Sequence, residues 1–478
     1  MNAKRCAVRA VAALAILASA VGCAGFLPKP EWEAPPPAIV EGPVVPQARL
    51  FRTTLDNGVA VLVLEDHALP RLSVGVVTRR GAASESLAEA GVAGMTLDVM
   101  KRGAGSRDAL ALARAVEEMG ASLSASAGWD SSSVGVGGLS EDADALFAVL
   151  ADVVRRPRFE PGEVGRARAE QLAAFEREKD EPHAVASRAL ARVLYGGHRY
   201  GISADGAPET VAKLDAQALR AWHARLFTPA QSIVYVVGDL GREQALARVR
   251  AHFGDWPAAP GLELGTPPPA ETPPARRVVL IDRPDQQQAS LLLGHEGISR
   301  RDPDRVAADL MNDILGSGGF LSRLMTKVRA EEGLAYGVGS AFSMRWYPGP
   351  FVVSTSTRVA EAGRVVEMLL AEIGGMRDEP PTDTELRQAK SYAAGSFVLG
   401  LETPAAIAGS LVDLDVYGLP PDSLDTYRSR LAAVSREDLA HESTVRLHPD
   451  RMAIVAVGPA ATLRPLLERF GTVELAEP

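Results

Sequence analysis

Residue types that could hold a metal ion are sparse and poorly spaced in this sequence. The eight histidines never form an H-x-x-x-H or H-x-H pair; they are His67, His183, His198, His223, His252, His295, His441 and His448. Each is therefore expected to be an ordinary surface or core histidine. Asp98 could touch a metal, but zinc needs several ligands and one carboxylate does not hold it. The sequence thus predicts no zinc site built by this chain alone.

The stretch Gly91–Gly103 nevertheless resembles a metal-binding motif, G-[LV]-A-H-x-x-E-H-[ML]-x-x-[KR]-G, of the pitrilysin/insulinase (inverted-zincin) peptidase family. In that motif two histidines on one helical face hold zinc and the glutamate acts as base. Gly94, Leu97 and Asp98 occupy these three positions, spaced i, i+3 and i+4. The resemblance implies a family member whose helix has lost both histidine ligands and the base.

The position of the family's third zinc ligand is also changed. In the family, a glutamate in an L-E-E-type helix supplies that ligand. The corresponding segment here reads Glu170-Gln171-Leu172-Ala173-Ala174-Phe175, with Ala173 and Ala174 at the expected positions. All ligand positions and the base are therefore absent together, so the resemblance implies no cofactor in this chain and no peptidase activity by the chain alone.

A second segment keeps the pattern of the family. Ser322–Tyr336 resembles S-R-L-x-x-x-[LIV]-R-E-x-x-G-L-A-Y, and its Arg329 and Tyr336 match an Arg/Tyr pair that binds the substrate backbone in family members. Guanidinium and phenol donors aimed at a carbonyl could stabilise negative charge developing on it. Two structural explanations stay open: the helix dipole favours Arg329 near a helix end, and Tyr336 could pack in a strand.

The surrounding pattern predicts an α+β fold with mainly antiparallel sheets packed with helices. Residues 51–55 and 59–64 flank Asp56-Asn57-Gly58, which predicts a hairpin with a type I′ turn. Ser106 is the expected N-cap of a helix that ends at Gly120. Further strands are expected at 72–77 and 131–136, and helices at 146–155 and 161–178.

The chain is expected to contain two domains that are diverged copies of one another, as in the family fold. A Pro-rich linker at 257–275 separates the parts 48–256 and 276–470. Each part ends with an apolar, strand-like run closed by glycine, at 232–238 and at 452–458. The offset of about 220 residues is too long for a solenoid repeat, which favours domain duplication.

The N-terminus has the pattern of an export signal. Residues 1–22 combine a basic start with the apolar run Val11–Val21, which is too short to span a bilayer. Ala20–Cys23 resembles a bacterial lipobox, with Cys23 as the lipidated residue and 23–47 as a Pro-rich tether. We expect an exported, periplasmic lipoprotein anchored to the membrane, with the outer membrane preferred. The alternative is an ordinary signal peptide cut near Ala24.

Together these features favour a non-catalytic subunit of a heterodimeric zinc-dependent peptidase. In some bacterial members of the resembled family, one chain brings the zinc ligands and the other brings the Arg/Tyr pair. The expected partners are thus a zinc-bearing homologue, a peptide substrate and the membrane, whereas the net charge of −9 argues against nucleic acid. The alternatives are a structural or peptide-binding pseudopeptidase and, less favoured, a hydrolase with an unrecognised site.

Overall fold

The computed structural model describes residues 38–268 and 275–477. The predicted signal peptide, Cys23 and the first part of the predicted tether lie outside these residues. Within them, the chain forms two six-stranded sheets and a two-stranded pair, β4 (Gly103–Ala104) with β5 (Arg107–Asp108).

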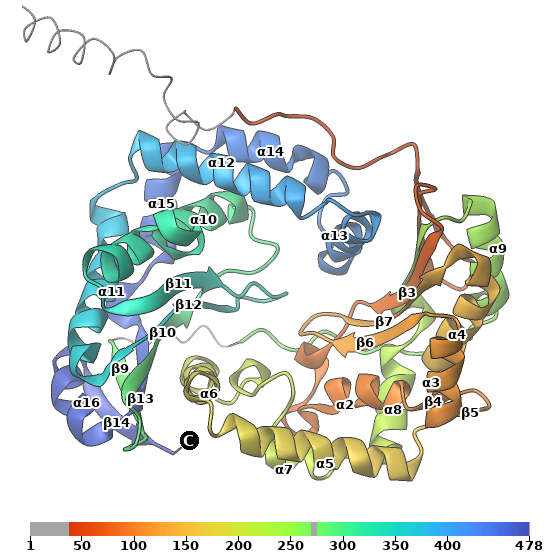
Figure 1. Ribbon diagram of the computed structural model, residues 1–478, viewed down its shortest axis with the longest axis horizontal. Helices are drawn as coiled ribbons and strands as arrows, with labels where there is room; N and C mark the ends of the chain where they lie inside the picture. The colour runs from red at the N-terminus through yellow and green to blue at the C-terminus, as the bar shows by residue number, and fades with distance from the viewer. Residues whose placement is uncertain (1–37, 269–274, 478) are drawn as a thin grey trace, which may run out of the picture. The chain divides into compact units, whose positions relative to one another are not determined.

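The N-terminal half contains one sheet of order β1-β2-β8-β3-β7-β6, of which β3, β7 and β6 are labelled in Figure 1. Its strands are β1 (Leu50–Thr54), β2 (Ala60–Glu65), β3 (Arg71–Thr78), β6 (Ser122–Ala127), β7 (Ser132–Leu139) and β8 (Ser232–Gly238). Its helices are α2 (Val92–Met100), α3 (Ala109–Glu118), α4 (Ala143–Arg155), α5 (Pro161–Glu178), α6 (Pro182–Tyr195), α7 (Pro208–Val211), α8 (Ala216–Leu226) and α9 (Arg242–Phe253).

The C-terminal half contains a sheet of order β11-β12-β10-β13-β9-β14. Its strands are β9 (Arg277–Asp282), β10 (Gln288–Glu296), β11 (Ala335–Phe342), β12 (Pro350–Arg358), β13 (Ala453–Gly458) and β14 (Thr472–Ala476). Its helices are α10 (Arg305–Asn312), α11 (Ala362–Asp378), α12 (Asp383–Leu399), α13 (Pro404–Tyr417), α14 (Ser423–Ala433), α15 (Arg436–Arg446) and α16 (Ala460–Leu467). Two π-helical segments, Asp313–Ser317 and Met325–Glu331, follow α10.

The two sheets repeat one topology, which confirms the predicted α+β fold with duplicated halves. The order β2-β8-β3-β7-β6 corresponds to β9-β13-β10-β12-β11. In each run the first pair is parallel and the other three are antiparallel. The glycine-closed runs singled out in the sequence are the equivalent strands β8 and β13, and β14 continues the second half beyond residue 470.

Helices pack on both faces of each sheet. On one face of each sheet, the packed helix belongs to the other half of the chain. In the C-terminal half, buried side chains of α10, α11 and α15 pack on one face of the sheet, and Val185, Ala186 and Leu190 of α6 pack on the other. Conversely, Leu411 and Val412 of α13 pack against the N-terminal sheet. A strand buried on both faces needs apolar residues at successive positions, which explains the continuous apolar runs of β8 and β13.

Polar contacts also connect the two halves. Asp130, in the β6–β7 turn, accepts hydrogen bonds from the Trp346 N–H and the Tyr417 hydroxyl, each at 2.9 Å. The last described part of the predicted tether also contacts the C-terminal half, because the Val44 and Val45 N–H groups donate to the Asp425 carboxylate of α14.

Two local predictions were wrong. The β1–β2 hairpin forms, but of its loop residues only Gly58 has positive φ, whereas a type I′ turn requires two such residues. Asn57 instead donates to the Phe253 and Trp256 carbonyls, which holds it outside the left-handed region. The N-cap of α3 is Asp108 and not Ser106, since the Asp108 carboxylate accepts the Ala111 N–H at 2.8 Å.

Within the described residues, no single helix is long and apolar enough to cross a membrane. The pair α12 and α13 reaches that length and composition together, but the two helices are bent by 108° at their junction.

Candidate functional site

The helix α2 carries the three positions at which the resembled family has its zinc ligands and base. Leu97 is only 1% exposed and belongs to the core of the N-terminal half, so a charged glutamate there would have to be buried. Gly94 and Asp98 are partly exposed. A Cβ atom added to Gly94 would meet nothing within 4 Å, so the missing histidine leaves open space beside the helix.

An arginine links α2 to α5 at this place. The Arg102 guanidinium donates to Asp98 at 2.7 Å and to Glu170 of α5 at 2.6 Å. Hydrogen bonding and attraction to Arg102 lower the pKa of Glu170. In the family, these two helices would share a zinc ion. Here an ion-pair bridge joins them, because Arg102 binds the carboxylates of both Asp98 and Glu170.

The donor set does not fit zinc. On α5, Ala173 is exposed and Ala174 is partly exposed, and neither can donate to a metal. Between residues 38 and 268 and between 275 and 477, no group of three or more His, Cys, Asp or Glu side chains is arranged to hold a metal ion. Two carboxylates bonded to one arginine lack the neutral imidazoles that a zinc site of this type requires.

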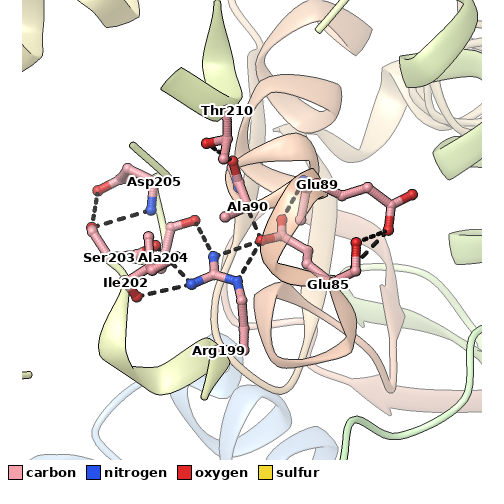
Figure 2. Close-up of polar contacts among 12 residues, drawn as sticks. Glu85, Glu89, Ala90, Arg199, Ile202, Ser203, Ala204, Asp205 and Thr210 are labelled. Atoms are coloured by element: carbon pink, nitrogen blue, oxygen red, sulfur yellow. Dashed lines mark hydrogen bonds and ion pairs between the residues drawn. The ribbon is translucent and has the colours of Figure 1, made fainter. Parts of the chain in front are cut away.

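The start of α2 is nevertheless held firmly, by a buried ion pair (Figure 2). Glu85, whose side chain is fully buried, accepts the Arg199 Nε–H at 2.9 Å and a second Arg199 donor at 2.5 Å. The same carboxylate accepts the N–H groups of Gly91 and Ala93 in the first turn of α2, at 2.9 and 2.7 Å. Burial raises the pKa of Glu85, whereas Arg199 and the two amides oppose that rise.

The remaining donors of Arg199 organise the loop that packs against α2. Its guanidinium donates to the carbonyls of Ile202, Ser203 and Ala204 at 2.8, 2.9 and 3.3 Å (Figure 2). Gly91 has φ of +95°, and a Cβ there would lie 2.6 Å from the Asp205 carbonyl oxygen. Only glycine therefore allows this close approach. The fold has kept the support of the helix although the helix has no metal ligands.

Arg329 and Tyr336 lie together at the surface of the C-terminal half. The Arg329 guanidinium is placed between two aromatic rings, 4.7 Å from the centroid of Phe320 and 4.8 Å from that of Tyr336. Tyr336 is 88% exposed and Phe320 is 71% exposed. Among the described residues, the Arg329 side chain has no hydrogen bond or ion pair, so its donors are available to a ligand. The strand-packing explanation of Tyr336 does not hold at this exposure.

A groove of about 730 Å³ runs beside this pair. Tyr336 lines it from β11, the edge strand of its sheet, and His183 of α6 lines it as well. The groove lining includes residues with small side chains or none, which leaves room for a ligand; they include Gly337, Gly339 and Ser354. An edge strand also offers unpaired backbone donors and acceptors to an extended chain.

The segment that carries Arg329 is fastened to α12 through a second ion pair. Arg323 donates to both Glu385 oxygens, at 2.7 and 3.1 Å, and Thr382 forms a capping box with the same carboxylate. Burial alone would raise the pKa of Glu385, but the bonds from Arg323 and Thr382 outweigh it and lower the pKa to about 2. Glu385 therefore stays ionised and holds the segment down to acidic pH.

This pair predicts part of the acid sensitivity of the fold. The pKa of Glu385 is depressed to about 2 in the folded state, so its contribution is present above its unfolded pKa of about 4.3 and is lost as pH falls toward 2. We expect Glu385→Gln to be less stable than wild type at neutral pH, by about 1 kcal/mol. The difference should shrink between about pH 5 and pH 2 in urea unfolding. A constant difference would contradict this assignment.

Sequence reasoning missed four residues of these sites. Arg102 stands at the motif's [KR] position, which was a usable signal, but its bridge depends on the approach of α5. Glu85 and Arg199 are 114 residues apart, and no spacing pattern links them. Phe320 lies two residues before the segment Ser322–Tyr336, but its contact with Arg329 depends on the backbone path between them.

Comparisons with known proteins agree with this geometry. Residues 60–206 match the family model described as Insulinase (Peptidase family M16), and residues 213–392 match the one described as Peptidase M16 inactive domain. A protein of Mycobacterium leprae named as an uncharacterized zinc protease is 28% identical over 364 residues, covering 74% of this chain and 80% of that protein. A Helicobacter pylori protein named Non-peptidase homolog YmxG is 25% identical over 386 residues, covering 80% and 87%.

The structural comparison gives a fold match along most of the chain. The crystal structure of a peptidase M16 inactive domain from Pseudomonas fluorescens superposes with a TM-score of 0.80 and 30% sequence identity. The match covers 86% of this chain and 98% of that one. The chain therefore belongs to the insulinase (pitrilysin/insulinase, M16) peptidase family.

Proposed function

We propose that this chain is the non-catalytic subunit of a heterodimeric zinc-dependent peptidase, in which it binds and orients the peptide for a zinc-bearing homologue. The observation that carries the proposal is the contrast between the two halves. The α2–α5 site holds the Arg102 ion-pair bridge where ligands would stand. Tyr336 is exposed and lines a groove, and the partly buried Arg329 lies against its ring with its donors unused by the described residues.

Neither side chain of this pair contributes much to the stability of the fold, which supports a role in binding. Tyr336 buries little surface. Replacing Arg329 would break no side-chain hydrogen bond or ion pair within the described part of the chain. A guanidinium held between two rings keeps its donor edge free and pays less entropy when it binds a carbonyl. An extended peptide along β11 could pair with the strand's backbone and receive these donors on one of its carbonyls.

The zinc then belongs to the partner subunit, because the donors of this chain do not fit it. We propose a homologue that carries the H-x-x-E-H motif and the distal glutamate. We further propose that both subunits work in the periplasm, with this chain anchored through Cys23 to the membrane, preferably the outer membrane. The support for that location is the N-terminal sequence pattern alone.

A pseudopeptidase that binds peptides without any role in proteolysis is the second candidate. It is favoured by the groove beside Tyr336, by the absence of a metal-holding group among the described residues, and by the name Non-peptidase homolog of the Helicobacter pylori relative. Both candidates predict peptide binding; only the first predicts that a zinc-bearing partner needs this chain.

Peptide binding by the isolated chain is therefore the first expected result. In the presence of EDTA, a fluorescent, unstructured peptide should bind and raise its anisotropy. Tyr336→Ala should weaken that binding about tenfold, as loss of an aromatic anchor does. Leu110→Ala is the matched control, because Leu110 is 60% exposed on α3, far along the chain from the groove. Absence of binding, or equal binding by Tyr336→Ala, would sink the peptide-orienting role.

A further inference from the structure

A second hollow, of about 670 Å³, lies in the C-terminal half and shares no lining residue with the groove beside Tyr336. It is enclosed by α10, α12, α13 and α14, and it combines a charged stripe with an apolar wall. The proposed peptide-binding site does not include this hollow. A ligand of the hollow would therefore be different from the peptide substrate.

The charged stripe runs along α10 and onto the first residue of the π-helical segment that follows it. Arg305, Asp309 and Asp313 are spaced i, i+4 and i+8 and all line the hollow. Asp313 already accepts the Ser317 hydroxyl at 2.7 Å. Arg305 and Asp309 form no ion pair with each other, and within the described residues neither side chain has another hydrogen-bond partner. Two opposite charges therefore line one space without a direct contact between them.

The lack of a partner is most costly at Arg305. Its Nη1 atom is buried and has no acceptor among the described residues. A buried charged donor without an acceptor is destabilising, so such groups usually have partners. The neighbouring Arg300 also lines the hollow, and it donates to Asp413 at 2.8 Å.

The wall formed by α12, α13 and α14 is largely apolar, although Ser396, Ser410 and Asp413 also belong to it. The ring centroids of Phe397 on α12 and Tyr427 on α14 lie 4.3 Å apart, with the rings tilted by 35°. Leu401, just after α12, and the buried Leu414 of α13 and Leu424 of α14 complete this wall. An occupant thus needs an apolar part in addition to groups that satisfy the stripe.

We propose that this hollow binds a free α-amino acid with an apolar side chain. Its carboxylate accepts from the Arg305 guanidinium, its ammonium group donates to the Asp309 carboxylate, and its side chain lies against Phe397 and Leu401. An α-amino acid carries both charges on one carbon, which suits two side chains one helical turn apart, about 5–6 Å between Cβ atoms. A ligand with a single charge would leave one member of the pair unsatisfied.

A divalent cation fits less well. The part of the chain that the structure describes contains no group of three or more His, Cys, Asp or Glu arranged for a metal, and Arg305 would repel one. The two free charges differ in sign, which matches a zwitterion. The proposal is independent of the peptidase role, so each can fail without the other.

Binding should depend on pH through Asp309. Burial raises the pKa of Asp309 to about 6, Arg305 and Arg300 oppose the rise, and Asp313 adds to it. Asp413 of α13 faces the same hollow in its pair with Arg300, and Tyr427 of α14 faces it as a neutral phenol. A protonated Asp309 cannot pair with an ammonium group, so affinity should rise as pH increases through about 6.

Calorimetric titration of the full chain with L-leucine at about pH 7.5 tests this assignment, supported by thermal shift. One leucine should bind per chain. Arg305→Met and Asp309→Asn should each weaken binding at least about tenfold. The exposed Arg387→Met and Asp378→Asn are the matched controls and should bind as wild type does. Asp309→Asn is nearly isosteric, so it should stay folded and keep the comparison valid.

Blocked ligands separate a free amino acid from a peptide end. N-acetyl-leucine lacks the ammonium group and leucinamide lacks the carboxylate, so each should bind at least about tenfold more weakly than leucine. The proposal is overturned if neither leucine nor phenylalanine binds up to about 10 mM. It is equally overturned if both pocket variants bind leucine like wild type, or if leucinamide binds as well as leucine does.

Discussion

Arg199→Met should lower the free energy of unfolding by about 3–5 kcal/mol, the largest stability effect that we expect from one substitution in this chain. The change leaves the Glu85 carboxylate buried with two amides but no cation, and it frees three loop carbonyls. Removing one member of a buried pair is costly for that reason, even where the intact pair adds little net stability. Urea unfolding measures the effect.

Arg192→Met is the matched control for this prediction. Arg192 is exposed on the neighbouring helix α6, so its replacement should change stability by no more than about 0.5 kcal/mol. Glu85→Gln should recover part of the loss when combined with Arg199→Met, because the double variant no longer buries an unpaired charge. A loss under about 1 kcal/mol in Arg199→Met would contradict the role of this pair in holding α2.

Local pattern predicted several elements of the N-terminal half but few of the C-terminal half, and it succeeded where local chemistry alone sets an element's bounds. The helix predicted at 161–178 has those bounds as α5, since Pro161 starts it and nothing distant alters its ends. The N-cap of α3 was misplaced because Ser106 and Asp108 both suit a cap, and only the backbone path selects Asp108. No element was predicted at α6, and local pattern does not indicate that the apolar face of this helix packs on the sheet of the other half.

For the candidate sites, residue types could be predicted from the sequence, but contacts between distant segments could not. Loss of ligands could be read directly from Gly94, Leu97 and Asp98, since a metal site depends on residue types. The Arg102 bridge and the placement of Arg329 between Phe320 and Tyr336 depend on distances between segments, which spacing along the sequence does not give.

Arg329→Met should lower kcat/KM of the reconstituted peptidase about 10²–10³-fold, the largest effect on activity that we expect. The substitution keeps an apolar side chain beside the two rings but removes all the guanidinium donors, so only the Tyr336 hydroxyl is left for the substrate carbonyl. Tyr336→Phe removes one neutral hydroxyl and should cost less, about tenfold. Because neither side chain contributes bonds to the described fold, both variants should unfold at the same urea concentration as wild type.

The control for these variants is Arg387→Met, which removes an exposed arginine of α12. It should leave kcat/KM of the pair unchanged. Arg329→Met acting as wild type does, or losing activity only because it unfolds, would remove this residue from the proposed site.

The central claim is that this chain supplies substrate-orienting groups and no metal chemistry to a divided peptidase. The rate of peptide cleavage by a zinc-bearing homologue, measured with and without this chain, tests it most directly. We predict no cleavage by this chain alone, little by the homologue alone, and a large increase when the two are combined. Cleavage by this chain alone, or a homologue equally active without it, would contradict the account.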